Sequence, residues 1–228
     1  MSRRARLAGG LYLTYILLTT LATTTRGGII VEGDPAATAR NIAASEELLR
    51  VSFVLDVLAG VLFLLTAWAL YVLLKPVNRD LALLFLLLNL AGVAVQCLNL
   101  LNLFAAVVVL GDPGFLATVG VDPSQSLATL FLDLYDNGFV IAQFFFAAWL
   151  LPLGYLVYRS GYLPRFLGVL LMVEFVAWGA YPLQYFLLPD WVGLSYVSFV
   201  VGLIAELTLA LWLLVRGATE PEPVPEPA

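Results

Sequence analysis

The chain has 228 residues, of which 62% are hydrophobic and only 12% are charged. A soluble domain is nearer half apolar and a quarter charged, so this composition excludes a soluble globular enzyme, a disordered protein and a nucleic-acid-binding module. With no histidine and one cysteine, Cys97, the chain also lacks the residues for His-based metal or haem sites, Ser-His-Asp catalysis and a disulfide framework. The net charge of −5 says little, because three acids lie in the last nine residues.

Six apolar segments are long enough to cross a bilayer as helices, which takes about 20 residues each. The first is the weakest because it holds six threonines, and the third and fourth are long enough that they should tilt or project from the membrane. We therefore predict an all-α, polytopic transmembrane bundle over residues 1–217. In chain order the spans cover residues 7–25, 51–74, 81–110, 127–158, 166–188 and 192–215.

Helix-starting and helix-ending residues separate these spans. Asp34 and Pro35 are typical of the capped start of a short helix in the first loop, and Asn78 can cap the third span. Residues 111–114, Gly-Asp-Pro-Gly, end the third span, and residues 122–124, Asp-Pro-Ser, indicate the cap and first turn of the fourth. Residues 218–228 are rich in Glu and Pro and should form a disordered tail.

The basic residues predict the orientation of the bundle in a plasma (inner) membrane. Eight lie at the N-terminus, the second-to-third turn, the fourth-to-fifth turn and the C-terminal end, against three in the first loop. Both termini should therefore be cytoplasmic. Trp149 and Trp212 are expected to anchor an aromatic belt at the membrane surface. A cleaved signal peptide in place of the first span is the less favoured alternative, because no Ala-x-Ala site is evident.

Polar side chains inside the spans are costly unless they face protein or water. On the third span, Asn89, Gly92 and the three amides that follow recur at spacings of three or four, so they share one helix face. Acids of the second and fourth spans lie toward the same, outer ends of their helices. We predict a partly hydrated vestibule in the outer half of the bundle, lined by Asp56, Gln96, Asn99, Asn102, Asp133, Asp136 and Asn137.

Simpler interpretations stand beside this one. Buried amides often bond one helix to another, each contributing roughly 0.6–2 kcal/mol, so the stripe on the third span either joins helices or lines a ligand path. Asp133 and Asp136 lie near the start of a helix, where acids complement the helix dipole.

Glu174 and Glu206 lie nearer the middle of the fifth and sixth spans. No lysine or arginine lies inside a predicted span, so a carboxylate there is not expected to pair with a buried cation. It must be protonated, reach water, bond to amides and hydroxyls, or hold a cation. Both glutamates are therefore candidate proton-titrating groups, or else members of a structural hydrogen-bond network.

Two short turns carry pairs of basic residues on the predicted cytoplasmic side: Lys75 and Arg79, then Arg159 and Arg165. Topology alone would explain them. They are also candidate contacts for anionic lipid headgroups, each worth about 1 kcal/mol near such a surface.

Four segments carry a resemblance to a known family. They read RLAGGLY at residues 6–12, ALYVLLKPVNRDLALL at 69–84, LGYLVYRSGYLPRFLGVLL at 153–171 and ELTLALWLLVRG at 206–217. Together they resemble the bacterial membrane-protein family named domain of unknown function 4386. The YRSGYLPR turn is the most specific part. The resemblance implies a compact integral membrane domain of six or seven helices, and it implies no reaction, substrate or cofactor.

Three functions compete. A non-enzymatic accessory, scaffold or lipid-interacting protein fits the sparse chemistry and short loops, and a small proton-linked transporter or permease fits the intramembrane carboxylates. An intramembrane enzyme with Asp133 and Asp136 as a carboxylate pair ranks last, since no phosphate-binding or oxyanion signature accompanies them. We expect no catalytic residue, cofactor or resident metal, and as partners the lipid bilayer and other membrane-protein subunits, not nucleic acid.

Overall fold

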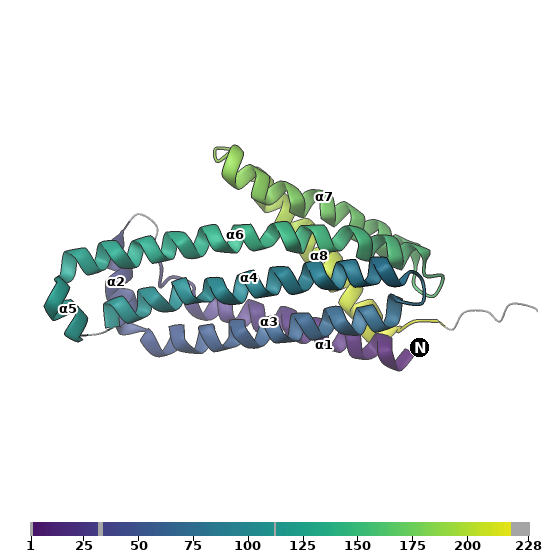
Figure 1. Ribbon diagram of the computed structural model, residues 1–228, viewed down its shortest axis with the longest axis horizontal. Coiled ribbons are helices and arrows are strands. Elements are labelled where there is room, and N and C mark those ends of the chain that lie inside the picture. Colours follow the sequence, from purple (N-terminus) through teal and green to yellow (C-terminus); the bar gives the residue numbers. More distant parts are fainter. Residues whose placement is uncertain (1, 32–33, 112, 220–228) are drawn as a thin grey trace, which may run out of the picture. The chain divides into compact units, whose positions relative to one another are not determined.

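The computed structural model describes residues 2–31, 34–111 and 113–219. Within them the chain forms eight α-helices and no strand (Figure 1). Six helices are long and apolar enough to cross a membrane, which makes the chain a multi-pass membrane protein. These are α1 (Ser2–Arg26), α3 (Glu46–Leu74), α4 (Arg79–Gly111), α6 (Val121–Arg159), α7 (Arg165–Leu187) and α8 (Gly193–Val215), with the short α2 (Pro35–Ala44) and α5 (Pro113–Val119) between them.

The predicted helix starts are largely confirmed. The Asp34 carboxylate accepts the backbone N–H of Ala37 at 2.8 Å and caps α2, and the Asn78 side chain accepts that of Leu81 at 3.0 Å at the start of α4. Each bond satisfies a backbone donor that has no partner within the helix.

Two features near the start of α6 differ from the prediction. Residues 113–119 form the unpredicted helix α5, and α6 begins at Val121, six residues before the predicted span. Ser124 lies inside the first turn of α6, where its hydroxyl donates to the Gly120 carbonyl at 2.7 Å. The first turn of the helix is found at these residues, as predicted, but Asp122, the predicted cap, is the second residue of the helix.

The chain divides into two compact units. The first comprises Met1–Leu13, Phe63–Gly92 and Gln143–Ala228, and the second comprises Thr14–Leu62 and Val93–Ala142. Helices α1, α3, α4 and α6 contribute residues to both units, whereas α7 and α8 belong wholly to the first.

The core of the first unit is aromatic. Trp149 is 1% exposed, and its ring meets Phe63 edge-on at 5.1 Å and Phe85 at 6.2 Å between centroids. The predicted role of Trp149 as a belt anchor is therefore wrong. A tryptophan side chain can bury its apolar ring either in a protein core or at a membrane surface, and the sequence pattern does not distinguish these two locations.

The core of the second unit is mainly aliphatic. Leu100 and Leu103 of α4 pack with Leu132 and Tyr135 of α6, and Ile42 of α2 joins them. The threonine-rich end of α1 also belongs to this unit, and its hydroxyls bond to carbonyls of the preceding turn, as from Thr25 to Leu21 at 2.7 Å. These bonds let a polar sequence remain helical in an apolar environment.

Candidate functional site

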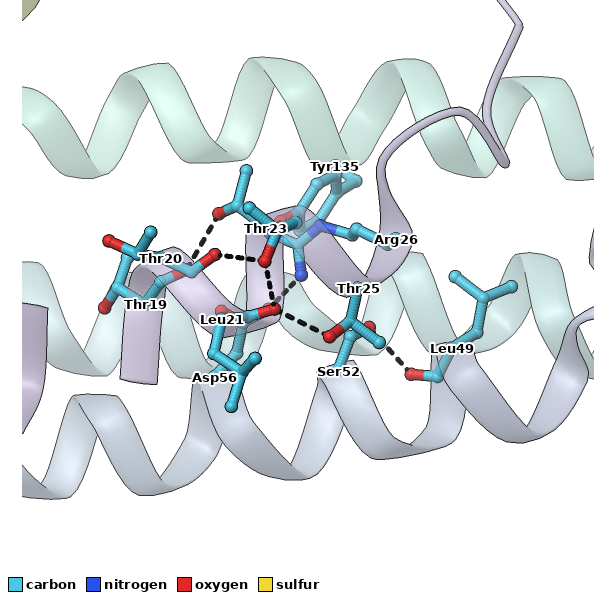
Figure 2. A network of polar contacts seen from close by, with 11 residues as sticks. Thr19, Thr20, Leu21, Thr23, Thr25, Arg26, Leu49, Ser52, Asp56 and Tyr135 are labelled. Carbon is cyan, nitrogen blue, oxygen red and sulfur yellow. Dashed lines mark hydrogen bonds and ion pairs between the residues drawn. The ribbon is translucent and has the colours of Figure 1, made fainter. Parts of the chain in front are cut away.

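The second unit contains an ion pair between two helices (Figure 2). Arg26, the last residue of α1, donates one guanidinium nitrogen to the Asp56 carboxylate of α3 and a second to the Tyr135 hydroxyl of α6 at 2.9 Å. The side chains of Arg26 and Asp56 are only 15% and 12% exposed. One arginine therefore ties three helices together.

This pair corrects the expectation that no intramembrane carboxylate meets a cation. Arg26 follows the threonine run directly, and the sequence predicts it in the first loop, but α1 extends to include it. An arginine at a helix C-terminus also complements the dipole of that helix. Asp56 thus has a structural partner, and its polarity does not require a ligand.

One amide of α4 in this unit bonds to another helix. Asn99 is 6% exposed; its side-chain nitrogen donates to the Tyr135 carbonyl of α6 at 2.8 Å, and its oxygen accepts from Asn102 at 3.1 Å. Gln96 has a buried oxygen with no hydrogen-bond partner among the described residues. The geometry of Asn99 favours the joining of helices over the lining of a ligand path, and Asn102 bonds to Asn99 within α4.

The remaining predicted vestibule residues lie on α6. Asp133 and Asp136 are exposed, and Asn137 is half-buried with its side chain donating to the Asp133 carbonyl of its own helix at 2.7 Å. The described residues contain no group of three or more His, Cys, Asp or Glu side chains placed to hold a metal ion.

In the first unit, α7 packs against α8 along a face with small and polar residues. The Ser198 hydroxyl of α8 donates to the Ala177 carbonyl of α7 at 2.6 Å, and the Ser195 hydroxyl donates to the Gln184 side chain. Gly202 continues this face, since a Cβ there would lie 3.0 Å from the Trp178 ring. Glu206 is on the same, α7-facing side of α8, because it continues a series with spacings of three or four residues: Ser195, Ser198, Gly202 and Glu206.

Glu174 of α7 enters this interface. It is 2% exposed, its Oε1 would lie 3.5 Å from a Cβ at Gly202, and its Oε2 is buried with no hydrogen-bond partner among the described residues. The Glu206 carboxyl, one helical turn beyond Gly202, is close enough to interact with it electrostatically.

Tyr12 of α1 approaches the same place from a third helix. Gly9 of α1 lies so close to α8 that a Cβ there would come within 2.7 Å of the Ala210 carbonyl. Tyr12 is one turn from Gly9, and Glu206 is one turn from Ala210, which brings the phenol close enough to the Glu206 carboxyl to interact with it. Glu174, Glu206 and Tyr12 are called the carboxyl pair and its tyrosine below.

A separate feature of the first unit is a hollow at the turn between α3 and α4. It has a volume of about 370 Å³ and is lined by Tyr71, Lys75, Pro76 and Arg79. The Lys75 amino group lies 5.7 Å from the centroid of the Tyr71 ring. At the next turn, Arg165 lies over the Tyr158 ring at 5.6 Å, and Arg159 is exposed.

Residues 7–217 match the protein family described as Domain of unknown function (DUF4386). The chain belongs to this family. An uncharacterized protein of Archaeoglobus fulgidus is 27% identical over 161 residues, which cover 71% of this chain and 80% of that protein. No solved structure matches. Membership in the family agrees with the predicted resemblance and assigns no activity to the chain.

Several residues of these arrangements were not singled out from the sequence. Tyr12, Trp178 and Arg26 each act through a contact with a distant helix, which no local pattern specifies. The spacing of Ser195, Ser198, Gly202 and Glu206 was a readable signal, because a small-and-polar stripe is typical of a helix–helix interface in membranes.

Proposed function

We propose that this chain is a non-enzymatic, multi-pass protein of the plasma (inner) membrane that binds anionic lipid headgroups at the turn between α3 and α4. The observation that supports the proposal is the hollow lined by Tyr71, Lys75, Pro76 and Arg79. Its two cations lie at the end of apolar helices, where a lipid phosphate would be within reach.

The lining residues have the chemistry that a phosphate headgroup requires. No ion pair among the described residues involves Lys75 or Arg79, so their charges are available to an anion. A guanidinium binds two phosphate oxygens at once, whereas an ammonium acts as a point charge. A tyrosine is well suited to the boundary between headgroups and acyl chains, because its ring is apolar and its hydroxyl polar.

Contacts in the first unit support a common basic end. Thr219 donates its backbone N–H to the Tyr162 carbonyl at 3.1 Å, and the Tyr162 hydroxyl donates to the Leu73 carbonyl at 2.6 Å. The C-terminal end, the α6–α7 turn and the end of α3 therefore meet. All eight basic residues of the predicted cytoplasmic side belong to this unit, and the other three belong to the second. This distribution supports cytoplasmic termini.

The test compares wild type with the double variant Lys75→Ala/Arg79→Ala. Each protein in neutral detergent is titrated with phosphatidylglycerol or phosphatidylcholine, and bound lipid is counted by native mass spectrometry. Two charges at about 1 kcal/mol each predict that the double variant binds phosphatidylglycerol roughly 30-fold more weakly, with phosphatidylcholine unchanged.

The matched control is Arg40→Ala, which removes an exposed cation of α2 in the second unit. It should bind phosphatidylglycerol as wild type does. An equal loss in both variants would mean that net charge, not the hollow, attracts the lipid. Titration with soluble glycerol phosphate separates a free phosphate ligand from a lipid, since only a lipid site should require the acyl chains.

A proton-linked transporter is the second candidate, and the carboxyl pair is the observation that favours it. Two acids within reach of one another in an apolar interior are typical of proton-handling sites. Proton uptake into vesicles containing wild type, but not those containing Glu206→Gln, is the expected result for this candidate. Equal uptake by the two proteins would remove it.

A further inference from the structure

The Trp178 ring next to the carboxyl pair already has a hydrogen-bond partner. The single N–H of the Trp178 ring donates to Gln143 Oε1 at 3.0 Å, so it is not available to Glu174. Gly202 contributes no side chain. Within the part of the chain that the structure describes, the titratable groups that face Glu174 are Glu206 from α8 and, next to Glu206, Tyr12 from α1.

The basic residues of these helices are not placed to neutralise the charge of the carboxyl pair. The basic residues of the helices that hold it lie at helix ends: Arg3, Arg4 and Arg6 of α1 and Arg165 of α7 are exposed, and Arg26 of α1 pairs with Asp56. Two ionised carboxylates held together in an apolar interior would repel each other and would each lose their hydration. One proton shared between them removes one charge and creates a donor.

The unpartnered Oε2 of Glu174 is consistent with this arrangement. A carboxylate is only an acceptor, so two ionised carboxylates cannot bond to one another, whereas a protonated carboxyl donates to its neighbour. The Tyr12 hydroxyl can then donate to Glu206 and hold it in place.

We infer that Glu174 and Glu206, positioned by Tyr12, form a binding site for one exchangeable proton at the interface of α7 and α8. The occupant is a proton and not a hard metal ion, which takes about six oxygen ligands, more than two carboxyls and one phenol supply. The inference does not depend on the lipid-binding proposal, because Lys75 and Arg79 are not part of this site.

The first test measures the carbonyl stretching band of a protonated carboxyl by infrared spectroscopy of the full chain in lipid vesicles. Spectra are recorded at intervals between about pH 6 and pH 9, above the ordinary range for exposed carboxyls. Wild type should show the band at about pH 7. Glu174→Gln and Glu206→Gln should each lose it, and Tyr12→Phe should shift its frequency because a hydrogen bond is removed.

Asp133→Asn is the matched control, since Asp133 is an exposed intrahelical acid of the second unit. It should leave the band unchanged. Absence of the band from wild type over the whole pH range would overturn the inference, as would its persistence in both glutamine variants. Loss of the wild-type band on addition of sodium chloride at constant pH would also overturn it, because a cation would then be the occupant.

A second test needs no variant that might fail to fold. Wild-type protein in vesicles is treated with a hydrophobic carbodiimide, which reacts with protonated carboxyls. The carboxyl proton moves to a carbodiimide nitrogen while a carboxyl oxygen bonds to the central carbon, so the reagent adds without a leaving group. Peptide mass spectrometry should place the adduct on Glu174 or Glu206, with labelling that falls as pH rises. Labelling of neither residue would contradict the inference.

Discussion

At the residue scale, two ion pairs on α1 and α3 differ in their surroundings. Arg26 and Asp56 are largely buried and join two helices, whereas Arg50 and Glu46 are 51% and 36% exposed and lie one turn apart on α3. Exposed pairs are screened by solvent and contribute little, but removal of one partner from a buried pair leaves an uncompensated charge. Both pairs join an arginine to an acid, but removal of one partner should lower stability more in the buried pair than in the exposed pair.

We expect Asp56→Leu to destabilise the protein by on the order of 3 kcal/mol, because Arg26 remains buried without its counterion. The double variant Arg26→Met/Asp56→Leu should recover much of this loss, since no charge is left behind. Thermal unfolding in detergent measures both.

The control for this pair is Glu46→Leu, which should cost about 0.5 kcal/mol. The interpretation of Asp56 as a structural ion-pair partner fails if Asp56→Leu is as stable as Glu46→Leu. It also fails if the double variant is less stable than both single variants.

At the element scale, the interface of α7 and α8 depends on a small residue at position 202. A Cβ at Gly202 would lie 3.0 Å and 3.1 Å from two atoms of the Trp178 ring, and that ring is held by its bond to Gln143. At Gly179 of α7, the nearest atom to an added Cβ is the Ala147 Cβ at 3.8 Å, an ordinary contact. The same substitution should therefore be destabilising at Gly202 but not at Gly179.

Gly202→Ala should lower stability by about 1 kcal/mol or more, because the ring has to move out of a packed position. Gly179→Ala should be neutral or stabilising by up to about 1 kcal/mol, since alanine favours the helix over glycine. The measurement is the melting temperature of each variant relative to wild type in the same detergent. Similar shifts of the same sign at both positions would contradict this description of the interface.

These elements also indicate how far the sequence predicts the fold. Apolar length and caps such as Asp34 and Asn78 define the helices locally, so their existence and approximate bounds could be predicted. The partner of Asp56 lies 30 residues away, and the Trp149 ring packs against Tyr12, Phe63 and Phe85 from three other helices. Such tertiary contacts do not change the local periodicity of the sequence. The sequence therefore identifies the site residues as polar groups but does not predict their partners.

At the scale of the whole molecule, the first unit gathers segments from both ends of the chain and from its middle. Gly217 lies beside Ser2, since a Cβ there would be 2.8 Å from the Ser2 hydroxyl. Thr219 bonds to the Tyr162 carbonyl through its backbone and its hydroxyl, both at 3.1 Å. Ala218 and Thr219 are thus held against the α6–α7 turn, and the rest of the predicted tail, residues 220–228, lies outside the described residues.

Tyr162 connects these segments to α3. It is 4% exposed and donates to the Leu73 carbonyl, one of the last four carbonyls of α3, which have no partner within the helix. Burial raises the pKa of Tyr162 to about 12. The folded state therefore favours the neutral phenol, and this contribution to stability is complete below the unfolded pKa of about 10 and is lost as pH rises through about 12.

Tyr162→Phe should lower stability by about 1 kcal/mol at neutral pH, because the Leu73 carbonyl loses its donor. The difference in melting temperature between wild type and Tyr162→Phe should stay constant up to about pH 10 and shrink between about pH 10 and pH 12, as the phenol of the unfolded wild-type chain ionises while the folded one stays neutral. Tyr158→Phe, which changes an exposed tyrosine one turn earlier, should show no such pH-dependent difference. A difference that is unchanged across this window would mean that the Tyr162 hydroxyl does not hold the turn to α3, and that the basic end of the molecule is assembled by packing alone.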